Sequence, residues 1–580
     1  MKTMKTLRRL FIILSGVVCA AACNLDRIPV DRLTADAVFS DPQAYQTWVN
    51  ECYTMFRGQS ALQEDADDFI DGDPCDVVAG TRSPYTQKWD WSMLKHINYL
   101  LENISKCSDE EIAASCEAQG LFFRGLFYFE MARKFGNLPY ITNTIGMQNK
   151  ELMYANPITQ DYVIDAAILD MEAALDGLPA ELSAAPTVVT QWVALGYIAR
   201  AALYEGTLLK YQGEAKADYE EYLKTAEQAC RRIMESGLFS VYRDKSWTDD
   251  NAYRNLFVME TMPSSEALLV QLFDTKTLPS GIQAAFTGLR TGATRRFINH
   301  YQLADGSSVS TRSGWRNANF FTEGEGRDPR LRQTILFPGC KEVSDNKEIR
   351  NQLQSLTGYE PIKYRRGPAG TAYNSCLPIM RYPEILLMYA EAKAELGTLT
   401  AEDVEATLNL IRARVGMPGV DMLKVNAAPD ALMASYYPNV TGRNKGIILE
   451  IRRERTIELA LEGLRLWDML RWHEGAQLGN NSGAMQGIYL SSTGLVDMTG
   501  NGSPDFELYS GTPTQDLVPA YSLGEEVFLS NGTFGYVTPF AEEKLPEEPW
   551  DEDCDYLWPI PAGELAIPGS KLVQNYGYYY

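Results

Sequence analysis

The sequence of 580 residues lacks most of the motifs by which catalytic proteins are detected. It has no nucleophile elbow (G-x-S-x-G), no zinc-protease motif (H-E-x-x-H), no Walker loop and no kinase motif set. Only three histidines are present and no C-x-x-C pair occurs, which argues against a zinc site. We therefore expect a protein that is not an enzyme. The acids of a glycoside hydrolase can lie far apart in sequence, so a surface hydrolase acting on glycans stays open as the alternative.

Positive charge is scarce relative to negative charge. There are 53 Lys and Arg against 76 Asp and Glu, which gives a formal net charge of −23. A chain of this charge repels phosphate, so a general nucleic-acid-binding function is excluded. Beyond the N-terminus there is no run of roughly 18 apolar residues that could span a membrane. The apolar fraction of 45% nevertheless supports a large core.

The N-terminus has the pattern of an export signal. Basic residues precede a short apolar run at 10–18, and Ala20-Ala21-Ala22-Cys23 follows. This pattern predicts a lipoprotein signal peptide over residues 1–22 and lipidation of Cys23, with an ordinary cleaved signal as the alternative. An exported protein can form disulfides, but the sequence does not pair the eight cysteines that follow.

Residues 445–472, KGIILEIRRERTIELALEGLRLWDMLRW, are predicted to form one helix that is apolar on two faces and buried between neighbours. Between those faces lie three glutamates spaced four residues apart: Glu454, Glu458 and Glu462. Like charges at this spacing repel each other, so we expect cationic partners. Arg455 and Arg465 are the nearest on the same helix, and other helices can supply more. A buried lattice of ion pairs is favoured over a catalytic role for these carboxylates.

Four separated motifs follow one another along the chain. They are an aromatic helix ending in Phe-Gly-Asn-Leu-Pro (121–140), RYPEILLMYAEAKAELG (381–397), the ER-x-x-ELA-x-EG segment (447–472) and a tail beginning LWPIP (557–578). Together they resemble the signatures of the SusD/RagB family. These are nutrient-binding lipoproteins on the surface of Bacteroidota, and they are partners of TonB-dependent outer-membrane transporters.

The resemblance implies a mainly α fold in which tetratricopeptide-like helix pairs pack with a loop-rich, irregular subdomain. Residues 23–580 would form a single SusD-like domain with four parts: a helical part (24–245), a loop-rich insertion (246–376), core helices (377–475) and an irregular C-terminal part (476–580). The implied function is non-catalytic capture of an extracellular nutrient, a glycan before peptides or other nutrients, and its delivery to a SusC-like TonB-dependent transporter. The implied location is the outer membrane, with a lipid anchor and exposure at the cell surface.

Ligand-binding residues usually lie in long loops on a rigid body, and saccharides need flat aromatic faces beside a few polar groups. The aromatic residues in loop-like context are Trp315, Trp89, Trp91, Trp247 and Tyr373. Trp315 is the first candidate, because its loop (303–321) is polar, contains glycine and lacks apolar periodicity. For each of the five, packing in the core or within a loop is the alternative.

The acidic stretch 64–76, EDADDFIDGDPCD, offers the oxygen ligands that calcium prefers. Asp71, Asp73 and Asp76 are the candidate ligands. Their spacing does not fit an EF-hand, and solvated carboxylates in a loop are the commoner reason for such a run. Apart from calcium, the sequence indicates no cofactor.

Overall fold

The computed structural model describes residues 38–56, 66–72, 75–145, 149–212, 218–368, 371, 373–478, 485–514, 518–540 and 550–578. The predicted signal at 1–22, the lipidation candidate Cys23 and the calcium candidate Asp73 lie outside the described residues. No described helix is both long enough and apolar enough to cross a membrane.

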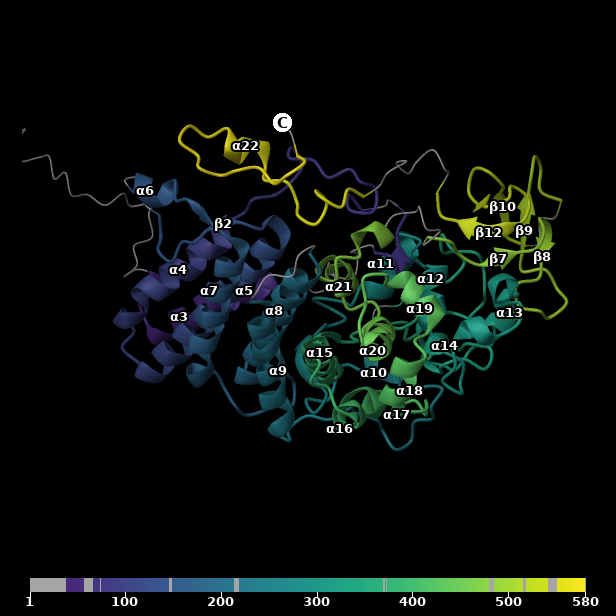
Figure 1. The fold of residues 1–580 in the computed structure, drawn as a ribbon, viewed down its shortest axis with the longest axis horizontal. Helices are drawn as coiled ribbons and strands as arrows, with labels where there is room; N and C mark the ends of the chain where they lie inside the picture. The colour runs from purple at the N-terminus through teal and green to yellow at the C-terminus, as the bar shows by residue number, and fades with distance from the viewer. Residues whose placement is uncertain are drawn as a thin grey trace, which may run out of the picture.

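The N-terminal part consists of helices packed in sequential pairs (Figure 1). The helices are α3 (Pro42–Cys52), η1 (Tyr53–Met55), α4 (Ser92–Asn103), η3 (Ile104–Lys106), α5 (Glu110–Phe135), α6 (Lys150–Met153), α7 (Gln160–Ala174), η4 (Leu175–Gly177), α8 (Gln191–Tyr211) and α9 (Tyr219–Glu235). Helix α5 packs against α7, α7 against α8, and α8 against α9. The prediction of a mainly α fold with tetratricopeptide-like pairs is confirmed.

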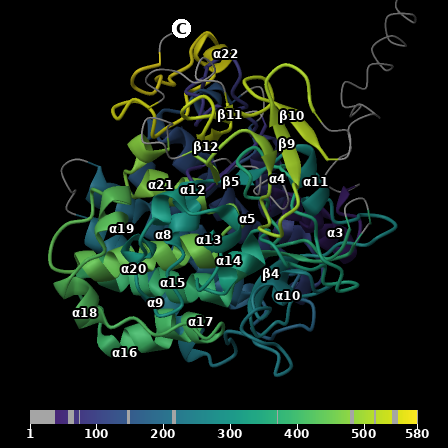
Figure 2. The ribbon, with the colours of Figure 1, turned by 90° about the vertical axis from the view of Figure 1, so that its right-hand side faces the viewer.

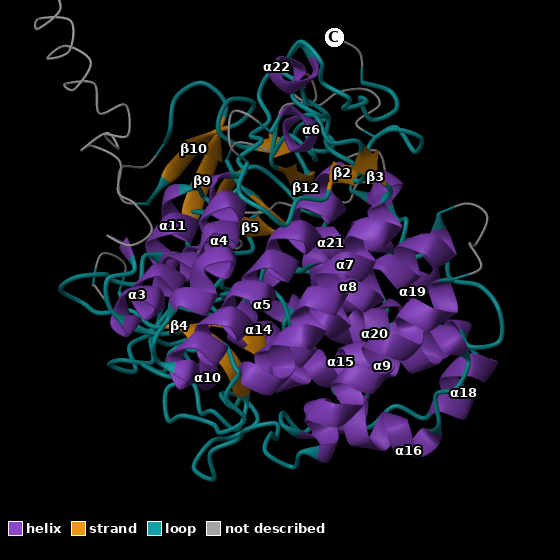
Figure 3. Ribbon diagram, turned by 90° about the vertical axis from the view of Figure 1, so that its left-hand side faces the viewer, coloured by secondary structure: helices purple, strands orange, loops and turns teal. Residues whose placement is uncertain are grey.

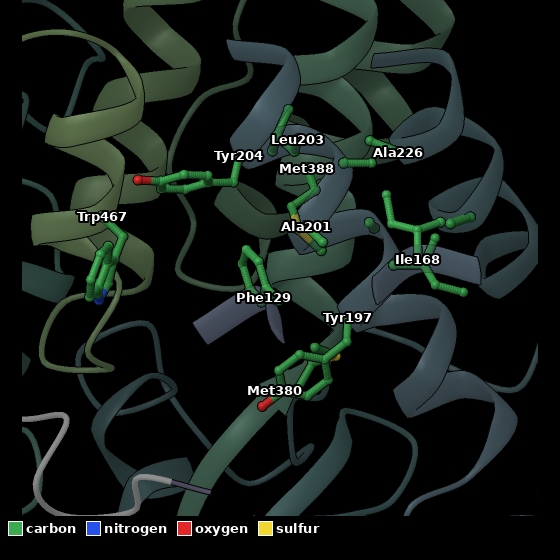
Figure 4. Packing of buried hydrophobic residues seen from close by; sticks show 14 of the residues in the cluster. Phe129, Ile168, Tyr197, Ala201, Leu203, Tyr204, Ala226, Met380, Met388 and Trp467 are labelled. Atoms are coloured by element: carbon green, nitrogen blue, oxygen red, sulfur yellow. The ribbon is translucent and has the colours of Figure 1, made fainter. Parts of the chain in front are cut away.

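Helix α8 lies at the centre of this part and, except at Arg200, is buried from Val193 to Leu209. Its Tyr197 and Tyr204 belong to one apolar cluster with Phe129 of α5 and with residues of the C-terminal half (Figure 4). Gly196 permits a close approach here, because any side chain at this position would collide with Met380. One core therefore joins the N-terminal helices to the central ones.

The central helices follow strand β6 (Leu377–Arg381). They are α15 (Tyr382–Leu396), α16 (Ala401–Val404), the π-helical η7 (Glu405–Asn409), α17 (Leu410–Ala413), α18 (Met422–Ala427), α19 (Ala431–Tyr436), α20 (Lys445–Glu458), α21 (Arg465–Arg471) and η8 (Gly475–Gln477). Pro383 lies in the first turn of α15, where its missing N–H costs nothing, and Gly397 ends that helix with a φ of 74°.

Short elements with long connections lie between α9 and β6. They are α10 (Arg254–Phe257), β4 (Ala267–Gln271), α11 (Ile282–Gly288), β5 (Gly292–Ala293), α12 (Arg295–His300), η5 (Val309–Thr311), η6 (Trp315–Asn317), α13 (Phe320–Glu323) and α14 (Arg330–Thr334). A second apolar cluster lies beneath them. Strand β4 pairs antiparallel with β6, which ties these loops to the central helices.

Small sheets gather near the C-terminal part of the chain (Figures 2 and 3). Strand β1 (Phe69–Ile70) pairs antiparallel with β5, and β2 (Leu138–Pro139) pairs antiparallel with β3 (Pro157–Ile158). Two three-stranded sheets have the orders β10-β9-β8 and β11-β12-β7, with only β9 and β10 parallel. Their strands are β7 (Tyr489–Leu490), β8 (Gly494–Val496), β9 (Phe506–Tyr509), β10 (Ala520–Ser522), β11 (Phe528–Leu529) and β12 (Gly535–Thr538). The tail with α22 (Ala562–Leu565) returns to α5, where Trp558 N–H donates to the carbonyl of Lys134 at 2.8 Å.

The prediction of one unbroken helix over 445–472 is wrong. Helix α20 ends at Glu458 and α21 begins at Arg465, with Leu461 and Gly463 at φ values of 58° and 73°. The last carbonyl of α20 finds partners elsewhere, because the Tyr253 hydroxyl donates to the Glu458 carbonyl at 2.6 Å and Arg381 Nη2 donates to the same oxygen. The segment therefore consists of two helices, α20 and α21, joined by residues 459–464.

The predicted buried ion-pair lattice is present, and its cations come from other elements and not from Arg455 or Arg465. Glu458 lies 3.0 Å from Arg330 and 2.6 Å from Arg381, and it also pairs with Arg414. Burial disfavours the Glu458 carboxylate, yet these three arginines outweigh that effect and lower its pKa to about 2.

The two neighbouring glutamates also bind cations distant in sequence: Glu454 pairs with Arg330 and Arg412, and Glu462 with Lys363 and Arg381. The expected partners on the same segment, Arg455 and Arg465, bind aspartates instead.

Candidate functional site

A cavity of about 310 Å³ opens where α12, η6, α19 and β12 meet. We call it the aromatic cavity. Its lining residues are Arg295, Arg296, Asn299, Trp315, Arg316, Leu432, Ser435, Tyr436, Gln477, Gln486 and Tyr536. Three aromatic rings thus share one space with guanidinium, amide and hydroxyl groups. The described lining contains no carboxylate.

The backbone around Trp315 is held by a buried arginine. Gly314 precedes η6 with a φ of 71°, a left-handed conformation that glycine adopts without strain. Arg295 donates from Nη2 to the carbonyls of Trp315 and Arg316 at 3.0 and 2.7 Å. The same guanidinium lies 3.1 Å from Glu323. The turn that carries the indole is therefore fixed from inside the molecule.

The two tyrosines of the cavity are also held by hydrogen bonds, Tyr436 through a buried arginine and Tyr536 through its own hydroxyl. Arg296 donates from Nη2 to the Tyr436 carbonyl at 2.7 Å, and its guanidinium lies 4.5 Å from the centre of that ring. The Tyr436 hydroxyl accepts from Asn299 at 3.1 Å. The Tyr536 hydroxyl donates to the Arg316 carbonyl at 2.9 Å. All three rings are half-buried, so part of each surface is open to a ligand.

A fully buried aspartate, Asp67, lies behind Arg296 in the wall of the cavity that α12 forms. Asp67 lies 2.9 Å from Arg296 Nε and accepts from Arg465 Nε and Nη2 at 2.6 and 2.7 Å. Although burial disfavours its charge, Arg465 and Arg296 lower the pKa of Asp67 to about 2. The pairing of β1 with β5 brings it beside α12. The adjacent Asp68 is also buried, and burial together with the charge of Asp67 raises the pKa of Asp68 to about 7.

The prediction that the acidic stretch consists of solvated carboxylates is therefore wrong for Asp67 and Asp68. Asp71 is buried too, where it accepts a hydrogen bond from Thr291, and burial raises its pKa. Asp76 accepts from Gln87 at 3.3 Å. Among the described residues, no three acidic, histidine or cysteine side chains converge as a metal site. With Asp73 outside the described residues, calcium binding stays a prediction.

Only Trp315 of the five aromatic candidates lines the aromatic cavity. Trp89 and Trp91 line a different, mainly apolar cavity of about 400 Å³ between α6, Pro139 and the C-terminal tail. Their rings pack edge-on against Phe135 and Phe127 of α5, at 5.0 and 5.5 Å between centroids.

The remaining two candidates lie elsewhere. Trp247 packs against Tyr242 at 5.7 Å between ring centroids, and Tyr373 pairs through its backbone with Ser280. Neither is among the residues that line the aromatic cavity.

Sequence reasoning missed Arg295, Arg296, Tyr436, Tyr536 and the supporting Asp67. The adjacent arginines in TGATRRF gave no specific signal, because Arg365-Arg366 is a second such pair in the same loop-rich insertion and does not line the cavity. The tyrosines carried no signal, because one ends a helix and the other lies within a short strand.

Comparison with known proteins identifies the family to which this fold belongs. A family model described as the SusD family matches residues 283–578, just over half of the chain. The chain belongs to the SusD family. A second model, described as "Starch-binding associating with outer membrane", matches residues 34–203. All residues that line the aromatic cavity, including its three rings, lie within the range matched by the first model.

Individual relatives of this SusD-family chain are distant. SusD-like protein P2 of Formosa agariphila is 22% identical over 535 residues, covering 90% of this chain and 85% of that protein. A SusD-like carbohydrate-binding protein from Bacteroides fragilis matches with a TM-score of 0.67 at 20% identity, covering 91% of this chain and 99% of the other. A SusD superfamily protein from Parabacteroides distasonis matches with a TM-score of 0.57 at 15% identity, covering 94% and 100%. At such identities the structures show a shared fold.

Proposed function

We propose that this SusD-family protein binds an extracellular saccharide in the aromatic cavity and does not cleave it. The observation that carries the proposal is the convergence of Trp315, Tyr436 and Tyr536 with amide and guanidinium donors in one cavity of about 310 Å³. The C–H faces of a pyranose pack against aromatic rings, while its hydroxyls take hydrogen bonds from a few fixed polar groups. Gln477, Gln486 and Asn299 supply such groups.

The chemistry of the cavity supports binding over hydrolysis. Glycoside hydrolases need two carboxyl groups flanking the scissile bond, about 5 to 9.5 Å apart. The described lining offers none. The carboxylates behind the wall, Asp67 and Glu323, are buried in ion pairs with Arg296 and Arg295. A carboxyl group with the lowered pKa of Asp67 is a poor proton donor at neutral pH.

We further propose that the protein is lipid-anchored at Cys23, faces the outside of the outer membrane and delivers its ligand to a SusC-like TonB-dependent transporter. The outer-membrane wording of the family model at 34–203 supports the location, and the N-terminal pattern supports the anchor. After detergent extraction, the protein should co-purify with a large outer-membrane barrel. Recovery only as a free monomer while the barrel is expressed would contradict the partnership.

Replacement of Trp315 tests the binding site. On saccharides selected from a glycan array, Trp315→Ala should weaken binding roughly tenfold or more, because ring stacking contributes on the order of 1 kcal/mol beyond area burial. The melting temperature should change little, since the ring is half-buried on a turn fixed by Arg295.

Phe534→Ala is the matched control. Phe534 is an exposed ring two residues before Tyr536, and it is not among the residues that line the cavity. The control should bind like the wild type. Equal binding by Trp315→Ala and the wild type would contradict this site, and release of shortened saccharide would contradict the absence of catalysis.

A further inference from the structure

The charge of the aromatic cavity is opposite to that of the protein. The chain carries a formal net charge of −23, yet the cavity is lined by Arg295, Arg296 and Arg316 with no acidic residue in the described lining. A site for a neutral sugar needs hydrogen-bond donors and rings but no excess of cations. The excess of positive charge in the lining therefore indicates which kind of saccharide the cavity binds.

The carboxylates behind the wall do not balance these cations. Asp67 forms ion pairs with both Arg296 and Arg465, so one negative charge faces two guanidinium groups. Glu323 pairs with Arg295, and it lies close to a further buried cation, Arg327.

The charge of Arg327 is not neutralised by Glu323. Its guanidinium donates to the backbone carbonyls of Ile298 and Tyr301, both at 2.7 Å, and forms no ion pair with a carboxylate in the described part of the chain. Burial lowers the pKa of Arg327 to about 10. Four guanidinium groups thus share Asp67 and Glu323 immediately behind the cavity. Asp68 near Arg465 and Glu474 near Arg296 are also buried, but burial raises the pKa of each to about 7, so they offset these cations only in part. The uncompensated guanidinium charges give the cavity a positive electrostatic potential, because charges partly removed from water are weakly screened.

Arg316 is the cation that a ligand can reach. Its side chain is exposed, and its guanidinium lies 4.5 Å from the centre of the Trp315 ring. Its backbone carbonyl is fixed by Arg295 and by the Tyr536 hydroxyl. Among the described residues no carboxylate pairs with it. An arginine stacked on an indole from a fixed turn is preorganised to present its planar donors at the rim.

We propose, on the basis of the proposed function, that the saccharide bound in this cavity is acidic. It carries a carboxylate or a sulfate ester, and Arg316 pairs with that group while the rings hold the sugar. Guanidinium matches either anion through two parallel N–H···O bonds, a geometry that Lys cannot reproduce. At physiological ionic strength the Debye length is about 8 Å, so the distant negative charge of the protein does not keep such a ligand away.

The experiment uses a glycan array that holds acidic saccharides beside neutral counterparts with the same backbone. Carboxylates are masked as methyl esters in one arm, and sulfate esters are removed in the other, so the two arms separate the sources of negative charge. The saccharide bound most tightly should be acidic. Masking or removing its charge should weaken binding about tenfold.

Three variants are compared on that saccharide and on the best-bound neutral one. Arg316→Gln should weaken binding of the acidic saccharide about tenfold, with less than a twofold effect on the neutral one, and Arg316→Lys should restore only part of the loss. Arg350→Gln controls for loss of one positive charge, because Arg350 is exposed and is not among the lining residues. Its binding should equal that of the wild type.

The outcomes distinguish this inference from the proposed function. If a neutral saccharide binds most tightly, and Trp315→Ala weakens it while Arg316→Gln does not, the acidic ligand is refuted and the saccharide site stands. If Trp315→Ala weakens binding of no saccharide on the array, the proposed function itself fails.

Discussion

Asp67 connects the buried ion pairs of the core to the wall of the aromatic cavity, so we predict that Asp67→Asn disturbs both. Asparagine keeps the size of the side chain and removes its charge. Arg296 and Arg465 would then face each other across an amide, with no anion between them. Breaking a buried ion pair by removing one partner typically costs about 3–5 kcal/mol, because the remaining charge is left uncompensated.

The pKa of Asp67 gives an independent magnitude. It is lowered from 3.8 to about 2. Each pKa unit corresponds to about 1.36 kcal/mol, so the interactions of the charged form contribute roughly 2.5 kcal/mol at neutral pH. Unfolding entropy is about 2.1 cal/mol/K per residue, or roughly 1.2 kcal/mol/K for 580 residues that unfold as one unit. A loss of about 3–5 kcal/mol should therefore lower the melting temperature by about 2.5–4 °C.

Calorimetric melting at several pH values is the assay. Because the folded-state pKa of Asp67 is lowered, its contribution is present above about pH 4 and is lost as the pH falls through about 2. The deficit of Asp67→Asn should be full at pH 7.5 and should shrink below pH 4. Glu221→Gln removes one partner of the exposed pair with Lys224 and should leave the melting temperature unchanged. A melting temperature of Asp67→Asn within about 1 °C of wild type at pH 7.5 would refute this reasoning.

Two further predictions address pH dependence and the anchor. The pKa of Asp68 is raised from 3.8 to about 7, so its protonated form contributes stability that is full below about pH 4 and is lost as the pH rises through about 7. The wild type should therefore lose stability between about pH 4 and pH 7, and Asp68→Asn should lose less over that range and melt higher than the wild type at pH 8. A steeper loss of stability in the variant would contradict this prediction. Cys23→Ala should move the protein from the membrane fraction to the soluble fraction, because the acyl chains contribute about 0.8 kcal/mol for each buried CH₂. Unchanged membrane association of that variant would count against the anchor.

The core was predictable where local spacing carries the information. Glutamates at 454, 458 and 462 repel one another on a helix, which predicted buried cationic partners before any fold was known. The partners themselves were not predictable, because Arg330 lies 124 residues from Glu454 and local periodicity contains nothing about such distances. The break after Glu458 was missed since the apolar periodicity continues through it, and only Gly463 indicated a turn.

The candidate site was predictable only in part. A large ring in a polar loop without periodicity pointed to Trp315, and this ring lines the aromatic cavity. Trp89 and Trp91 looked similar in sequence, but they lie just before α4 and pack against Phe135 and Phe127 of α5. Tyr436 and Tyr536 reach the cavity from elements 100 residues apart, which only the tertiary fold brings together.

Amide hydrogen exchange, measured with and without a saturating concentration of the saccharide bound most tightly, tests the central claim most directly. Binding in the aromatic cavity should slow exchange at 315–317, 431–436 and 535–538, the backbone segments that carry its three rings. Slowed exchange confined to 150–155 and 564–572, beside Trp89 and Trp91, would contradict the account and place the ligand in the apolar cavity.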